Sequence, residues 1–152
     1  MIMRSLSFLL LMLFSLCSQA VVTGEMIMVR SSEAFPETMS TLQQAISDRG
    51  YSLTRVQRVD VGLTAKGYAT DKYRVVFFGK GEQVKQLAAD YPQLIPYLPL
   101  KIAIYAEGDN TILISANPAS FNDMFDIPQL KPVFNQWQRD IVDILNSMQS
   151  AN

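Results

Sequence analysis

The side chains that could carry chemistry in this chain are carboxylates, lysines and tyrosines. The 152 residues include no histidine and one cysteine, so the usual serine triad and imidazole acid–base chemistry are excluded. Five acidic residues are the candidates for carboxylate chemistry: Asp60, Glu107, Asp109, Asp123 and Asp126. Glycoside hydrolysis needs two carboxylates at a fixed separation, and a sequence gives no distance. A carboxylate hydrolase is therefore one hypothesis.

Asp60 is the strongest catalytic candidate of the five, because the others have ordinary local roles. Asp109 lies in a predicted turn, and Asp123 and Asp126 precede or begin a predicted helix, where aspartates form turns and caps. Asp60 instead ends a predicted strand. A strand-end aspartate is more often a hydrogen-bonded structural residue, so that role remains the alternative.

A second candidate site is the segment Gly79, Lys80 and Gly81, which lies between a predicted strand and a predicted helix. Free backbone N–H groups and the helix dipole favour an anion there, and Lys80 adds a positive charge. The glycine spacing is not that of a P-loop. The alternative is a plain turn whose glycines supply positive φ, with Glu82 already satisfying the helix dipole.

Metal and cofactor sites have little support. Met26 and Met28 share one face of a predicted strand, and paired thioethers can hold Cu(I). Methionine is also a common filler of protein cores, and two ligands are few. No EF-hand spacing occurs, so no calcium loop is predicted. We expect no cofactor and keep a copper-handling module as a further hypothesis.

The first third of the chain predicts a strand and a helix. Residues 26–30 (MIMVR) favour a β-strand. Apolar residues then recur at helical spacing from Phe35 to Ile46, with Ser31 or Ser32 as the N-cap and Gly50 as the stop signal.

The middle third predicts two further strands and a short helix. Residues 51–61 favour a strand, but the apolar alternation changes phase after Leu53, which indicates a β-bulge. Residues 62–71 are predicted to form a loop. Residues 72–78 (KYRVVFF) predict a central strand, because apolar residues occupy both faces. A short helix over 84–91 ends at Pro92.

The last third predicts a hairpin and a long helix. Three prolines within residues 92–99 exclude regular helix and central strand there. Residues 100–106 and 111–116 alternate on either side of a turn at 107–110, the pattern of a hairpin. From Phe134 to Met148 one broad apolar stripe predicts a long terminal helix. Together the elements predict a two-layer α+β domain with a mainly antiparallel sheet of four to five strands covered by helices.

The first twenty residues predict export. Arg4 precedes an apolar run over residues 6–16, and Ser18, Gln19 and Ala20 provide small residues at the cleavage positions, which is typical of a secretory signal peptide. An uncleaved anchor is the alternative, but the run is short for a spanning helix. We expect cleavage after Ala20, a single domain over 21–152, and a periplasmic or secreted protein. Removal of residues 1–20 also removes Cys17, so the mature chain can form no disulfide.

Charge and hydropathy limit the partners. The full chain has a net charge of −1 with no basic cluster, so nucleic-acid binding is not expected. No stable membrane insertion is expected after cleavage. The remaining partners are a small anionic ligand or a second copy of the chain.

Four segments resemble the bacterial domain of unknown function family 302. They are residues 56–60 (VQRVD), 75–79 (VVFFG), 98–101 (LPLK) and 117–118 (NP), in the order of the family. The resemblance covers residues from about 35 to 119. It implies a two-layer α+β fold with an antiparallel sheet and a long terminal helix, often in a homodimer, and no activity.

Two departures from the family pattern limit what the resemblance implies. Val61 follows Asp60 where many relatives have histidine, and Lys80-Gly81 replaces Asn-Pro after Phe78-Gly79. The preferred hypothesis is therefore a small exported protein that acts by binding. Asp60 and Lys101, polar positions within the matched motifs, are candidate ligand contacts together with Gly79, Lys80 and Gly81.

Overall fold

The computed structural model describes residues 20–149. The predicted signal peptide lies outside the described residues except for Ala20, and so does Cys17. None of the described helices is long and apolar enough to cross a membrane.

The strands form one antiparallel sheet in the order β1-β2-β6-β5-β4-β3. Its members are β1 (Val21–Val22), β2 (Met26–Ser31), β3 (Ser52–Arg58), β4 (Tyr73–Gly79), β5 (Leu100–Glu107) and β6 (Asn110–Ala116). The predicted hairpin is β5 and β6. The α+β class and antiparallel sheet are confirmed, but the sheet has six strands, not four to five. The additional strand, β1, is only two residues long, too short to show an alternating pattern.

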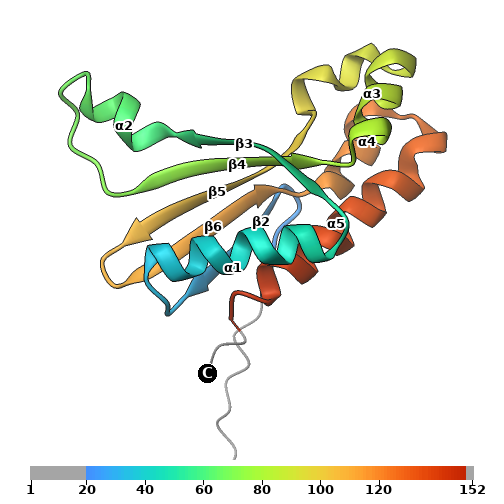
Figure 1. Cartoon of the computed structure of the whole chain (residues 1–152). Helices are drawn as coiled ribbons and strands as arrows, with labels where there is room; N and C mark the ends of the chain where they lie inside the picture. Colours follow the sequence, from blue (N-terminus) through green and yellow to red (C-terminus); the bar gives the residue numbers. More distant parts are fainter. Residues whose placement is uncertain (1–19, 150–152) are drawn as a thin grey trace, which may run out of the picture.

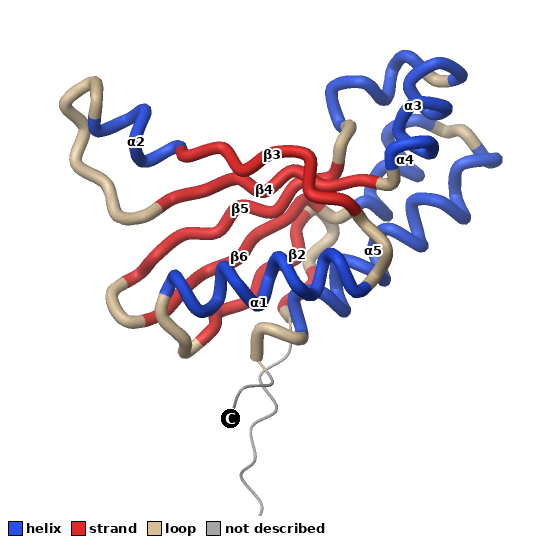
Figure 2. Tube along the Cα trace, in the orientation of Figure 1, coloured by secondary structure: helices blue, strands red, loops and turns tan. Residues whose placement is uncertain are grey.

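The helices lie on one face and at the ends of this sheet (Figures 1 and 2). They are α1 (Phe35–Asp48), α2 (Val59–Thr64), α3 (Gly81–Asp90), α4 (Phe121–Phe125) and α5 (Lys131–Asn146), with 3₁₀ turns η1 (Pro92–Tyr97), η2 (Pro118–Ser120) and η3 (Pro128–Leu130). Helix α1 contacts β3, β5 and β6, and α5 contacts β2 and α1. The predicted long terminal helix is therefore confirmed.

The core lies between the sheet and helices α1 and α5. In β2, β4, β5 and β6 most strand residues that point to this side are almost fully buried, and they meet the apolar stripes of the two helices. The edge strand β3 is more exposed, with Val56 at 37%. The largest fully buried side chains are Ile27, Leu42, Ile46, Phe78, Leu94, Ile102, Ile104, Leu113, Phe134, Ile141, Ile144 and Leu145. Hydrophobic burial therefore fixes which face of each strand turns inward.

Two local predictions are wrong. Residues 59–64 form the helix α2, not the end of a strand and the start of a loop, and none of its residues is buried. The β-branched Val59 and Val61 favoured a strand, but Asp60 lies in the first helical turn and pairs with Arg74 of β4. Helix α1 begins after Ala34 with Pro36 in its first turn, so neither Ser31 nor Ser32 is the N-cap. Ser31 belongs to β2, where its hydroxyl accepts a hydrogen bond from the Glu33 backbone N–H at 3.2 Å.

The bulge predicted in the third strand is confirmed. The register of β3 against β4 shifts between Leu53, which lies opposite Phe78, and Arg55, which lies opposite Phe77. Thr54 is the extra residue. The bulge turns Arg55 to the face that Phe77 occupies and returns Val56 to the helix-covered face, where it lies opposite the buried Val76.

Candidate functional site

One face of the sheet carries half-buried and exposed side chains, in contrast to the buried face against α1 and α5. We call it the open face. The register assigns to it Met26, Met28, Arg30, Arg55, Gln57, Tyr73, Val75, Phe77, Lys101, Ala103, Tyr105, Glu107, Asn110, Ile112, Ile114 and Ala116. β4 is an inner strand of the sheet, as predicted. Although both of its faces carry apolar side chains, only those that face the helices are fully buried. Most of the open face is apolar, which is typical of a surface that binds.

A hollow with a volume of about 680 Å³ lies at one end of the open face. It is bounded by the turn before β2, by η1, by the start of β5 and the end of β6, and by α4. Its lining is Gly24, Glu25, Pro96, Tyr97, Lys101, Ala116, Ser120, Phe121, Asp123 and Met124. We call it the Lys101 hollow. A volume of this size suits a small ligand.

Aromatic rings in edge-on contact form the apolar wall of the Lys101 hollow. The ring of Tyr97 meets that of Phe121 edge-on at 5.1 Å between centroids and that of Phe125 at 5.3 Å. Phe121 in turn packs against the buried Phe134 at 5.5 Å. The prolines of residues 92–99, which prevent regular structure, let η1 bring Tyr97 to this position. Edge-on aromatic contacts give a wall anchored in the core.

Asn117 holds the turn before β2 against η2. Its side-chain amide donates hydrogen bonds to the carbonyls of Thr23 at 3.2 Å and Gly24 at 3.3 Å. Its side-chain oxygen accepts one from the Ala119 N–H at 3.1 Å. Asn117 is buried, so these bonds satisfy its polar atoms away from water. The residue therefore joins two walls of the hollow. It belongs to the segment 117–118 that resembles the family, and the sequence alone did not show this role.

The charged side chains of the hollow come from three elements. Lys101 is exposed, and within residues 20–149 its ammonium has neither an ion-pair partner nor a hydrogen bond. Its backbone carbonyl accepts a hydrogen bond from the Ser115 hydroxyl at 3.0 Å, which ties its position to β6. Glu25 and Asp123 are also exposed. From the described part of the chain, the hollow thus offers one free cation, two carboxylates and an aromatic wall.

Asp60 lies far from this hollow in the fold. It belongs to α2, at the opposite end of the molecule from α3 (Figure 1), and its carboxylate is ion-paired with the Arg74 guanidinium. Both side chains are about 15% exposed (14% for Arg74). The hydrogen bond from Arg74 lowers the pKa of Asp60, with help from the Val61 N–H, although desolvation opposes it. Asp60 therefore stays ionised, which suits a structural ion pair or a base more than a general acid. The structure does not bring Asp60 and Lys101 together.

The segment from Gly79 to Gly81 joins β4 to α3. Lys80 is the N-cap residue of α3, and its ammonium lies 4.7 Å from the centre of the Tyr51 ring, a cation–π contact. Neither glycine has positive φ. Gly79 is required for space, because a Cβ there would lie 2.8 Å from Cγ2 of Val84. The anion site predicted at this segment stays a prediction.

Met26 and Met28 share the open face of β2, as their spacing predicted, and their side chains are exposed. Among residues 20–149 no group of three or more His, Cys, Asp or Glu is placed to hold a metal ion. Copper binding through the two thioethers stays a prediction.

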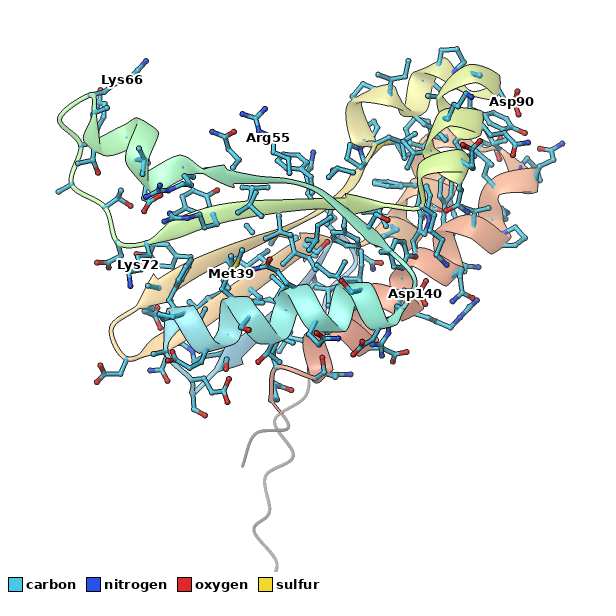
Figure 3. The ribbon with its side chains drawn as sticks, viewed as in Figure 1. Met39, Arg55, Lys66, Lys72, Asp90 and Asp140 are labelled. Atoms are coloured by element: carbon cyan, nitrogen blue, oxygen red, sulfur yellow. The ribbon has the colours of Figure 1, made fainter. Side chains whose placement is uncertain are left out.

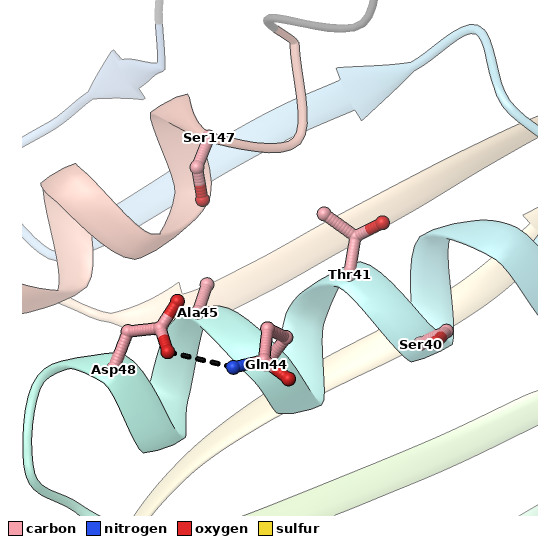
Figure 4. Close-up of a pocket in the computed structure, with 6 residues that line it drawn as sticks. All are labelled: Ser40, Thr41, Gln44, Ala45, Asp48 and Ser147. Atoms are coloured by element: carbon pink, nitrogen blue, oxygen red, sulfur yellow. Dashed lines mark hydrogen bonds between the residues drawn. The ribbon is translucent and has the colours of Figure 1, made fainter.

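A second hollow, of about 390 Å³, lies between α1 and the end of α5 (Figure 4). It is lined by Ser40, Thr41, Gln44, Ala45, Asp48 and Ser147. The Gln44 amide donates to the Asp48 carboxylate at 2.6 Å, and the Ser147 hydroxyl donates to the Ile144 carbonyl at 2.6 Å. Its polar groups are thus largely engaged with each other and with the backbone, and it has no aromatic wall. We regard the Lys101 hollow as the better candidate site.

Comparison with known proteins gives a family and a fold. The family model of the domain of unknown function DUF302 matches residues 27–148. A crystal structure of an uncharacterized conserved DUF302 protein from Bacillus stearothermophilus is similar, with a TM-score of 0.73 and 18% sequence identity, over 82% of this chain and 98% of that one. At 18% sequence identity, this similarity establishes a common fold and no common function. No curated protein matches the chain.

Proposed function

Because the chain belongs to the DUF302 family, whose name carries no activity, we propose a function from the chain's own surface: it is an exported protein that binds a small carboxylate with an apolar body in the Lys101 hollow. The family match spans most of the chain, in agreement with the resemblance stated from the sequence. The proposal rests on one observation: the ammonium of Lys101, which has no partner among residues 20–149, lies beside the aromatic wall of Tyr97 and Phe121.

The chemistry of this hollow favours an amphipathic anion. Ligand sites combine apolar lining with a few polar groups that fix the orientation of the ligand. Tyr97 and Phe121 provide apolar contact, and Lys101 provides a charge-assisted hydrogen bond for a carboxylate. Glu25 and Asp123 repel a negative group near them. We therefore expect the carboxylate of the ligand at Lys101 and its apolar body against the aromatic rings.

Lys101 is a stronger anion ligand than Lys80, which the sequence also suggested. The Lys80 ammonium is engaged by the Tyr51 ring, and an anion would have to compete with that contact. The Lys101 ammonium has no such partner within residues 20–149.

Lys101→Ala is expected to weaken the binding of nonanoate by about tenfold, the scale of one charge-assisted hydrogen bond. Isothermal titration calorimetry of the mature protein measures the affinity, and Lys85→Ala, which removes another lysine outside the hollow, is the matched control. Equal affinities of wild type and Lys101→Ala contradict the site. The same preparations are tested on hydrolase substrates: turnover that Asp60→Asn abolishes favours the carboxylate hydrolase.

Export is the second part of the proposal, and it is supported by the charged start, the short apolar run and the small residues that end at Ala20. Val21, the expected first residue of the mature protein, is also the first residue of β1. N-terminal sequencing of the protein from a periplasmic extract is expected to begin at Val21. A sequence that begins at Met1 in a membrane fraction contradicts this prediction.

We further propose that the apolar part of the open face pairs with a second copy of the chain. Tyr73, Val75, Tyr105 and Ile112 lie toward the end of this face that is remote from Lys101. The exposed ion pair of Arg30 and Glu107 lies at the same end. A patch whose border carries both signs of charge can pair with a copy of itself about a two-fold axis.

Tyr105→Glu is expected to convert the dimer to a monomer, because it places a charge within the proposed apolar contact. Light scattering over a range of concentrations measures the mass. Tyr68→Glu is the matched control, since Tyr68 is 64% exposed in the loop after α2 and lies off the open face. A wild-type mass of one chain at high concentration contradicts the dimer.

A further inference from the structure

A second cation lies on the open face two strands away from Lys101. In β4, Phe77 lies opposite Lys101 of β5 on one side and opposite Arg55 of β3 on the other. The three side chains therefore form a row across the strands, with the aromatic ring in the middle. Neighbouring strands are about 4.8 Å apart, so the Cα atoms of Arg55 and Lys101 are separated by about 10 Å.

The β-bulge at Thr54 is what gives Arg55 this position. In a regular ladder without the bulge, Thr54 would lie opposite Phe77, and Arg55 would lie opposite Val76 and point to the side of the helices. Figure 3 shows the Arg55 side chain directed away from α1. Bulges often aim a side chain at a functional site. Within residues 20–149 the Arg55 guanidinium has no ion-pair partner and no hydrogen bond.

Arg55 also lines a hollow of its own, of about 290 Å³, together with Thr54, Gln57, Phe77 and Pro99. Phe77 of this hollow and Lys101 of the Lys101 hollow lie opposite each other on neighbouring strands, so the two hollows are adjacent. Pro99, two residues before Lys101, belongs to the wall on the Arg55 side. The open face thus holds two adjacent hollows with a cation at each and an aromatic ring between them.

We propose that the ligand is an elongated dianion with one carboxylate at Lys101 and a second at Arg55. Its apolar chain lies over Phe77, whereas a monocarboxylate such as nonanoate, which has no second carboxylate for Arg55, keeps its chain against Tyr97 and Phe121. This inference rests on the proposed function, because it assumes that Lys101 binds a carboxylate. Glu25 and Asp123 disfavour a second negative group inside the Lys101 hollow. A guanidinium can hold a carboxylate through two parallel hydrogen bonds, so Arg55 suits the second carboxylate.

Calorimetric titration with azelate and nonanoate tests the proposal, because the two molecules have the same chain length and differ by one carboxylate. The carboxylates of extended azelate lie about 10 Å apart, close to the spacing of two strands. Wild type is expected to bind azelate at least about tenfold more tightly than nonanoate. Arg55→Ala is expected to remove that advantage and to leave the affinity for nonanoate unchanged, whereas Lys101→Ala weakens both.

Arg58→Ala is the matched control, because Arg58 lies on the same strand but opposite Arg74, on the other face of the sheet. It is expected to leave both affinities unchanged. Equal affinities of wild type for azelate and nonanoate overturn the dianion and leave the proposed function standing. If Arg55→Ala does not change the affinity for azelate, the dianion is likewise overturned and the proposed function stands. Absence of binding by both molecules overturns the proposed function together with the inference.

Discussion

Trp137→Ala is expected to lower the free energy of unfolding by roughly 3 to 5 kcal/mol, the usual cost of removing a large buried aromatic side chain. Trp137 lies in the middle of α5, is 3% exposed, and packs against the ring of Phe134 at 5.8 Å between centroids. Its indole N–H donates a hydrogen bond to the side-chain oxygen of Gln83 in α3 at 3.3 Å. The substitution therefore loosens the contact between α5 and α3 and leaves a cavity beside the aromatic wall.

Denaturant unfolding followed by circular dichroism measures this loss, because a domain of this size unfolds in one cooperative step. Tyr68→Ala is the control for an exposed aromatic residue and is expected to change stability by less than about 0.5 kcal/mol. Trp137→Phe, which keeps most of the apolar contact and loses the bond to Gln83, is expected to lie between the two. A loss below about 1 kcal/mol for Trp137→Ala means that α5 is peripheral to the core.

Asn117→Ala is expected to lower the free energy of unfolding by about 2 to 3 kcal/mol and to weaken ligand binding at Lys101. The substitution removes three hydrogen bonds of a buried side chain and leaves the carbonyls of Thr23 and Gly24 without that donor. Gly24 and Ser120 line the Lys101 hollow on either side of this junction. Without these bonds the walls of the hollow are more flexible in the free protein and must be ordered when the ligand binds. The affinity therefore falls although no direct contact with the ligand is lost.

Asn110→Ala is the matched control for Asn117→Ala. Within the described chain the Asn110 side chain makes no hydrogen bond, and the residue lies at the turn of the β5–β6 hairpin, away from the hollow. Unfolding and nonanoate titration are measured on both variants. If Asn117→Ala and Asn110→Ala have the same stability and affinity, Asn117 does not hold the two walls together.

Two findings about the site concern its charged residues. The sequence predicts that Asp60 is a carboxylate at the end of a strand, within a segment that resembles the family. In the structure it lies in helix α2 and is ion-paired with Arg74. Lys101 lies in the same kind of motif, and it lines the Lys101 hollow beside Tyr97 and Phe121. The two residues looked equivalent in the sequence. They differ because α2 brings Asp60 beside Arg74, whereas nothing within residues 20–149 pairs with Lys101.

The sequence determined the secondary structure wherever an apolar pattern persisted over several residues. The stripes of α1 and α5, the alternation of β5 and β6, and the change of phase that marks the bulge at Thr54 were all visible, because each repeats a local period of the backbone. The six-residue helix α2 and the two-residue strand β1 were missed. Neither of these two elements buries a residue, and both are too short to show a period.

The position of the site depends on tertiary packing and could not be predicted from the sequence. The walls of the Lys101 hollow come from segments near residues 24, 97, 101 and 121, and no local pattern relates them. The alternation of residues along β4 and β5 divides their side chains between the two faces of the sheet. It does not show which of the two faces the helices cover. That choice follows from the packing of α1 and α5 against Ile102, Ile104 and Val76, which leaves Phe77 and Lys101 on the open face. Arg55 joins them because one extra residue in β3 changes the direction of every side chain after it.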